Sequence, residues 1–179
     1  MAKELKCPRR TEQEIVNDLT AILQLKGLHY YTRRGVAWKA IWDFSEIDGR
    51  LDNPRFGWSR RAEALRKKNK GGARGLRREH CFPMAGCIDS LLALPSPTFD
   101  EVLALLRRAA TVYVLTAEED AAVNRKFRSK WPAGYALDDP LARYKATTGI
   151  VIEFARHAAA SVPNARSAVS GSPGEPGRA

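Results

Sequence analysis

The sequence predicts an α+β fold that is mainly α-helical, with a small β-hairpin or short sheet. A Thr-x-x-Glu capping box precedes apolar residues at helical spacing three times along the chain. The best strand candidate is TVYVLT at 111–116, which has the β-branched and aromatic composition of a buried strand. With 179 residues, of which 44% are hydrophobic and 28% charged, the chain has the size and composition of one domain with a real core.

The first two elements are predicted to be helices. The first helix begins at the capping box of Thr11, and its apolar residues continue at helical spacing until Gly27 supplies a stop signal. The aromatic-rich segment that follows, HYYTRRGVAWKAIWDF, is ambiguous between strand and helix, and we favour a helix over 36–44. This helix brings Trp38 and Trp42 onto one face at i, i+4. Such a pair is more typical of a core than of a binding site, so we interpret it as core.

The middle of the chain combines a basic helix with a glycine-rich loop. Ser59 caps a short basic helix that runs to Lys68. Gly71, Gly72 and Gly75 then break the chain into a flexible loop.

The second half predicts further helices around the strand. Pro83 begins a short helix, and the capping box at Thr98 opens a longer one. The capping box at Thr116 starts a helix that contains Asn124. An Asp-Pro pair then starts a last helix over 139–149, which a glycine stops.

We expect one globular domain over residues 1–160 and a flexible tail over 161–179, because the tail is small, polar and rich in Pro and Gly. No apolar run reaches the roughly 18 residues that a membrane span needs, and the amino terminus lacks the apolar core of a signal peptide. We therefore expect a cytoplasmic protein without a membrane partner. Three cysteines are too few for a disulfide framework, so we expect reduced thiols.

Positive charge is concentrated in residues 55–78. This basic segment holds ten basic residues and one acid, Glu63, and so carries nearly all of the formal net charge of +10. A block of one sign repels itself unless a counter-charge arrives, which favours a polyanionic partner. We predict a nucleic acid, with DNA favoured over RNA; the alternative is a solvated basic loop. The predicted contact residues are Arg55, Arg60, Arg61, Arg66, Lys67, Lys68, Lys70, Arg74, Arg77 and Arg78.

Two aromatic residues, Phe56 and Trp58, adjoin the basic block. They have the chemistry to stack on bases. The more typical role is to anchor the following helix to the core.

The basic stretch ends in REHCFP, which places Glu79 beside His80. A carboxylate can hold a hard divalent cation, and a neutral imidazole can take a proton from a water that attacks phosphorus. The alternative is structural: His80 is half-buried and donates to a backbone carbonyl, while Glu79 pairs with an arginine.

REHCFP resembles the acid-His-x-x-Pro signature of the HNH, or ββα-metal, nucleases. In that family a strand ends in the metal-binding acid and the general-base histidine, and a second strand and a helix follow. The resemblance implies that TVYVLT pairs with the strand leading into Glu79, that Asn124 joins Glu79 at Mg²⁺ or Mn²⁺, and that His80 is the catalytic base. Residues 83–110 would form a helical insertion between the two strands.

Three classes of function follow. The first is a metal-dependent endonuclease of the HNH type that hydrolyses DNA phosphodiesters, and it requires Glu79, His80 and Asn124 to converge. The second is a non-catalytic DNA- or RNA-binding protein whose basic segment contacts phosphates. The third is an interaction protein whose basic segment docks an acidic partner.

Overall fold

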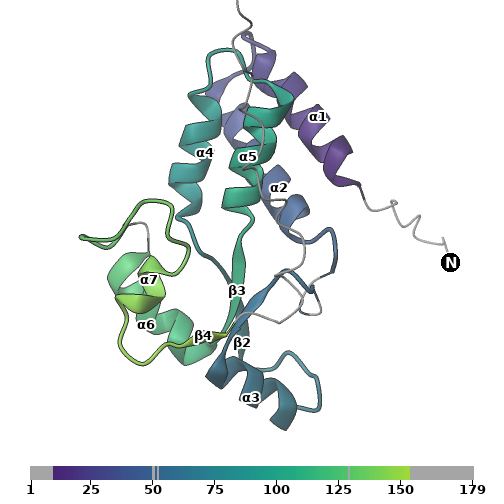
Figure 1. Cartoon of the computed structure of the whole chain (residues 1–179). Coiled ribbons are helices and arrows are strands. Elements are labelled where there is room, and N and C mark those ends of the chain that lie inside the picture. Colours follow the sequence, from purple (N-terminus) through teal and green to yellow (C-terminus); the bar gives the residue numbers. More distant parts are fainter. Residues whose placement is uncertain (1–9, 50, 52, 129, 154–179) are drawn as a thin grey trace, which may run out of the picture.

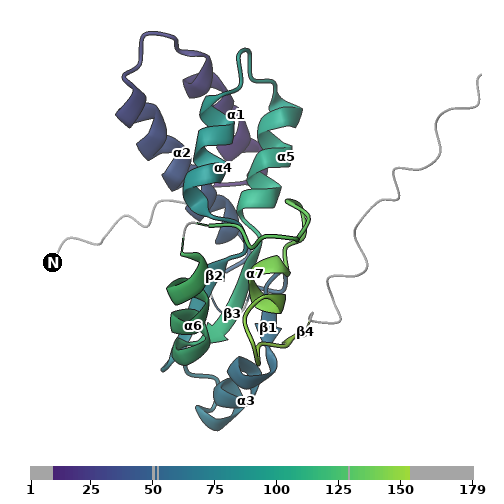
Figure 2. The ribbon, with the colours of Figure 1, turned by 90° about the vertical axis from the view of Figure 1, so that its left-hand side faces the viewer.

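The computed structural model describes residues 10–49, 51, 53–128 and 130–153. These ranges contain seven helices and a four-stranded sheet, so the fold is α+β and mainly helical, as predicted. Figures 1 and 2 show a helical bundle at one end of the molecule, with the sheet and the remaining helices at the opposite end. The predicted tail over 161–179 lies outside the described residues.

The bundle is formed by two helix pairs, one from each half of the chain: α1 (Glu12–Gln24) with α2 (Tyr30–Ser45), and α4 (Met84–Leu92) with α5 (Phe99–Ala109). All four helices bury an apolar face in one core, which includes Leu19, Ile41, Leu91 and Leu106. The predicted capping boxes begin α1 and α5, each with both reciprocal hydrogen bonds. Burial of these faces removes apolar surface from water and so stabilises the bundle.

The predicted start of the second helix is wrong. α2 begins at Tyr30 rather than at position 36, and the His29 side chain caps it by accepting a hydrogen bond from the Tyr31 amide at 3.4 Å. Aromatic residues and an interior Gly35 lower the helix propensity of this segment. Tertiary packing overrides that propensity, because α2 buries Ala37, Ile41 and other small or apolar residues against the bundle.

The sheet has the strand order β2-β3-β1-β4. Its strands are β1 (Gly57–Ser59), β2 (Leu76–His80), β3 (Val112–Thr116) and β4 (Ile152–Glu153). β2 runs antiparallel to β3 with His80 opposite Val112, which confirms the predicted pairing of TVYVLT with the strand leading into Glu79. β1 runs parallel to β3, and β4 runs antiparallel to β1; neither short strand was predicted.

Helices cover both faces of the sheet around the fully buried β3. On one face, Val112 and Val114 pack with Phe56 and Trp58 under α3 (Arg60–Lys68). Phe56 and Trp58 are 2% and 8% exposed, so both are core anchors. The opposite face, which includes Tyr113, packs against α6 (Ala117–Phe127) and α7 (Ala142–Lys145).

The predicted last helix is too long. The side chain of Asp139 accepts from the Leu141 amide at 2.9 Å and closes a turn, and the four-residue α7 follows. α7 is held by burial of Arg143 and Tyr144 rather than by its own length. In the described part of the chain, no helix combines the length and the apolar character that a membrane span requires.

Candidate nucleic-acid interface

Strand β2 sends Glu79 and His80 to opposite faces of the sheet. Successive side chains alternate along a strand. His80 therefore lies on the face of Trp42, with the ring centroids 4.7 Å apart. Glu79 lies on the face of α6 and α7, where it meets Arg143. The sheet itself thus separates the predicted metal ligand from the predicted base.

His80 is part of the core. Its side chain is 6% exposed, and Nδ1 lies 2.9 Å from the carbonyl oxygen of Ala109. An imidazole Nδ1 can only donate to a carbonyl, so this nitrogen carries the proton. Burial lowers the pKa of His80 and favours the neutral ring. The donation to a backbone carbonyl is the one expected if His80 is structural, although the ring is buried rather than half-buried. Nε2 is also buried, without a partner among the described residues.

Glu79 belongs to an ion-paired cluster between the sheet and two helices. Its Oε1 lies 2.8 Å from Nη1 of Arg143, whose side chain is 1% exposed. The same Arg143 nitrogen donates to the carbonyl of His80 at 3.0 Å. Asp120 lies within hydrogen-bonding reach of Glu79, and Asn124 donates to Asp120 at 2.8 Å. The structure therefore brings Glu79 and Asn124 together through one carboxylate, that of Asp120.

Burial raises the pKa of both carboxyl groups in this cluster, those of Glu79 and Asp120. It raises the pKa of Glu79, and the positive charge of Arg143 opposes the rise. It also raises the pKa of Asp120, against the opposing charge of Arg77. Two partly buried carboxyl groups in contact hold a proton between them more readily than exposed ones do.

The cluster as arranged fits an internal ion pair better than a divalent cation. A cation at Glu79 would have to share the carboxylate with the buried guanidinium of Arg143. Asn124 directs its amide nitrogen at Asp120, whereas a hard cation requires the oxygen. Within the described ranges, no three His, Cys, Asp or Glu side chains gather in a way suited to a metal ion.

The ten residues of the predicted basic contact set divide into paired and unpaired groups. Four of them form ion pairs with acids in the described part of the chain: Arg55 with Glu12 and Asp48, Arg60 with Glu153, Lys67 with Glu63, and Arg78 with Glu46. Arg66 places its guanidinium 4.9 Å from the ring centroid of Trp58. Arg77 donates to the carbonyl of Leu76 at 3.0 Å.

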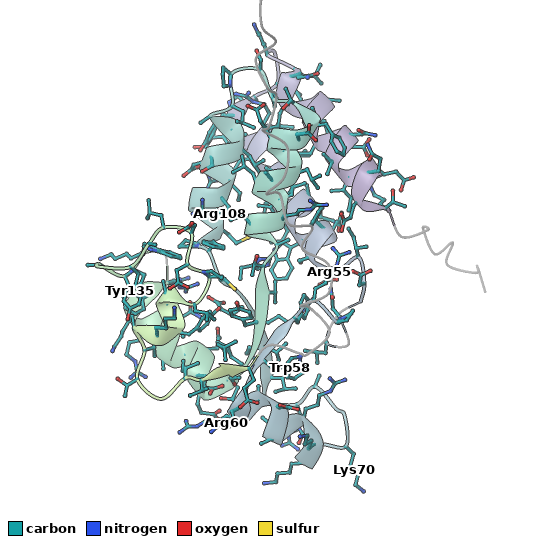
Figure 3. All side chains as sticks on the ribbon, viewed as in Figure 1. Arg55, Trp58, Arg60, Lys70, Arg108 and Tyr135 are labelled. Atoms are coloured by element: carbon teal, nitrogen blue, oxygen red, sulfur yellow. The ribbon has the colours of Figure 1, made fainter. Side chains whose placement is uncertain are left out.

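The four remaining side chains form the free basic set: Arg61, Lys68, Lys70 and Arg74. All four are exposed, and none makes an ion pair with any described residue. Arg61 and Lys68 lie seven positions apart, two turns along the same face of α3. The other two lie on the loop after α3, and Figure 3 shows Lys70 projecting from its outer end. The set therefore presents uncompensated positive charge to solvent on one helix and its adjoining loop.

The loop over residues 69–75 has a defined turn geometry. Lys70, Gly71 and Gly75 have φ angles of 50°, 88° and 76°, in the left-handed region that glycine adopts readily. The side chain of Asn69 donates to the carbonyl of Arg74 at 2.7 Å and closes the loop. Lys70 and Arg74 thus project from a hydrogen-bonded turn.

A groove of about 580 Å³ lies between this loop, β2 and the end of α2. Its walls include Trp42, Gly71, Ala73, Leu76, Arg77 and Arg78. The Arg78 guanidinium lies 5.5 Å from the ring centroid of Trp42 and is held there by its ion pair with Glu46. The groove therefore combines an indole wall with the guanidinium of Arg78, whereas Arg77 directs its side chain to the other face of β2, toward Asp120.

The interpretation of the tryptophan pair as core is wrong for Trp38, which is 49% exposed. Its ring centroid lies 5.9 Å from that of Trp42, which is half-buried at the groove. α2 buries the face that carries Ala37, Ile41 and Phe44, so the tryptophans fall on a neighbouring face. The spacing predicted that the two rings lie together but did not indicate which face of the helix is buried.

Comparisons with protein-family models, with curated proteins and with solved structures find no match for this chain.

Sequence reasoning missed three participants in these sites: Asp120, Arg143 and Trp42 as a groove wall. Asp120 stands four residues before Asn124, and this helical spacing was a usable signal for their contact. Arg143 carried no such signal, since it meets Glu79 only through the tertiary fold.

Proposed function

We propose that the protein binds nucleic acid, with DNA favoured, through α3, the 69–75 loop and β2, and that it does so without cleaving its ligand. The observation that carries the proposal is the free basic set, four exposed cations with no acid to neutralise them within the described residues. Phosphate contacts by Lys and Arg release condensed counterions, which supplies affinity independent of sequence.

The position of His80 supports the non-catalytic form of this proposal. A general base must come within hydrogen-bonding reach of the water that it activates. His80 Nδ1 is engaged by Ala109, Nε2 is buried, and Glu79 lies across the sheet. The free basic set needs none of these groups in order to bind phosphates.

The test is a binding titration with two charge-matched quadruple variants. One variant replaces the free basic set: Arg61→Ala, Lys68→Ala, Lys70→Ala and Arg74→Ala. The control removes four exposed basic residues at and beyond the end of α6: Arg125→Ala, Lys126→Ala, Arg128→Ala and Lys130→Ala. Both variants lose the same net charge, so a difference between their DNA affinities depends on where the removed charges lie.

We expect the free-set variant to lose affinity at every salt concentration. For labelled DNA of mixed sequence, the slope of log K against log salt should flatten by about three to four, since each phosphate contact contributes about 0.9 in a duplex and about 0.7 in a single strand. The control should keep most of the wild-type slope. An equal loss of DNA affinity in both variants would show that net charge, and not the position of the residues, determines binding. Unchanged affinity in the free-set variant would contradict the proposed interface.

A further inference from the structure

We propose that the bound nucleic acid is single-stranded and that its bases stack on the exposed Trp38 and in the adjoining groove lined by Trp42 and Arg78. This inference rests on the proposed function and specifies the class of ligand. Proteins that hold single strands combine a positively charged groove for the backbone with aromatic side chains for the bases. Both parts are present here on adjoining elements.

The aromatic part is Trp38, whose exposure the fold does not require. Phe56 and Trp58 are structural aromatic residues, since both are buried under α3. Trp38 leaves about half of its surface in water. It stands one helical turn from Trp42, which lines the groove, and the two ring centroids lie 5.9 Å apart.

Arg78 extends the stacking surface into the groove. Its guanidinium is held near the Trp42 ring by the ion pair with Glu46, and its side chain keeps 23% of its surface exposed. Guanidinium planes, like aromatic rings, stack on unpaired bases. The half-buried Trp42 is itself supported edge-on by His80, which gives the buried histidine a positioning role for this surface.

The backbone part lies on the opposite wall. The loop that carries Lys70 and Arg74 contributes Gly71 and Ala73 to the groove lining. A single strand with its bases on the indole side would direct its phosphates toward these cations. In a duplex the bases are stacked on one another, so their faces do not reach Trp38.

The test compares a labelled oligo(dT) strand with a mixed-sequence duplex of the same length. Trp38→Ala should weaken binding of the strand by about 5- to 100-fold, as expected for loss of one stacked base, and should leave duplex binding unchanged. Trp38→Phe should recover most of the loss, because the ring face is retained. Leu137→Ala, which truncates another exposed apolar side chain, is the control and should change neither affinity. Strand binding should also quench tryptophan fluorescence in the wild type, and less in Trp38→Ala.

The outcomes separate this inference from the proposed function on which it rests. Equal affinity for strand and duplex, with no effect of Trp38→Ala on either, would overturn the stacking groove and leave the phosphate interface standing. No binding of either DNA at low salt would overturn both. Preferential binding of polyglutamate without fluorescence quenching would also overturn both, in favour of an acidic protein partner.

Discussion

At the scale of single residues, burial has opposite effects on the pKa values of Glu79 and His80 but favours the same uncharged state in both. It raises the pKa of the Glu79 carboxyl and lowers that of the His80 imidazole. The two neighbours lie on different faces of the sheet, so each shift arises in its own environment. Arg143 opposes the shift at Glu79, and the carbonyl of Ala109 opposes the shift at His80.

The lowered pKa of His80 predicts a specific dependence of stability on pH. In the unfolded chain, histidine takes up its proton as the pH falls through about 6.5. The folded protein resists that protonation, so below this pH the unfolded state binds more protons and the free energy of unfolding decreases. The loss approaches at most about 1.4 kcal/mol per pH unit and ends once the pH falls below the lowered pKa of the folded state.

Urea unfolding of the wild type and of His80→Asn between pH 5 and pH 7.5 measures this effect. Asparagine does not titrate, and its amide can still donate to the carbonyl of Ala109. The raised pKa values of Glu79 and Asp120 act in the opposite sense, since they favour the folded state as the pH falls. These contributions are common to both proteins, so the difference between them isolates His80. If the free energy of unfolding changed with pH in the same way in both proteins, the assignment of this pH dependence to the lowered pKa of His80 would be contradicted.

At the scale of elements, the pairing of β1 with β3 depends on the absence of a side chain at one position. A Cβ atom at Gly57 would lie 2.5 Å and 2.6 Å from two ring carbons of Tyr113. Tyr113 is 2% exposed and packs edge-on against Tyr144, with the centroids 5.2 Å apart, so its ring has little room to move. Gly57 therefore permits the close approach that places β1 beside the central strand.

Two glycine-to-alanine substitutions should consequently have opposite effects on stability. Gly57→Ala should lower the free energy of unfolding by about 1–3 kcal/mol, because overpacking forces the sheet or the Tyr113 ring to shift. Gly35→Ala should raise it by about 0.5–1 kcal/mol, since this position is inside α2 and, apart from the helix's own backbone, the new methyl group would meet nothing within 4 Å. Thermal or urea unfolding of the two variants provides the measurement. A stabilised Gly57→Ala protein would contradict the described packing of β1.

Short-range signals explain which elements could be predicted from the sequence. α1, α5 and α6 begin at capping boxes whose partners lie three residues apart, so their starts could be read directly. β1 and β4 have three and two residues, too few to show alternation, and they exist through pairing with distant segments. The same distinction applies to the site. The basic segment is contiguous in sequence, whereas Glu79 and Arg143 become neighbours only in the folded chain.

At the scale of the whole molecule, the bundle and the sheet end contribute different parts of the proposed interface. α2 belongs to the bundle, and its Trp42 reaches the groove whose other wall is formed by β2 and the loop after α3. The free basic set lies at the sheet end, around α3, which Figure 1 shows farthest from the bundle. Binding thus depends on the relative placement of the two ends, which β2 links through the contacts of His80 with Trp42 of α2 and Ala109 of α5.

This arrangement leads to a prediction about chemistry, since a hydrolase of the HNH type needs acid and base to converge and the sheet keeps them apart. We expect wild-type protein to bind labelled duplex DNA, single-stranded DNA and RNA in Mg²⁺ or Mn²⁺ and to leave each substrate intact. Glu79→Gln should then change stability through its buried partner Arg143, without any loss of a cleavage activity. Glu118→Gln, which alters an exposed acid on α6, controls for the loss of one negative charge. Metal-dependent cleavage that chelator and Glu79→Gln abolish, and that Glu118→Gln retains, would overturn the non-catalytic proposal. It would also require the cluster of Glu79, Asp120 and Asn124 to release Arg143 in the active state.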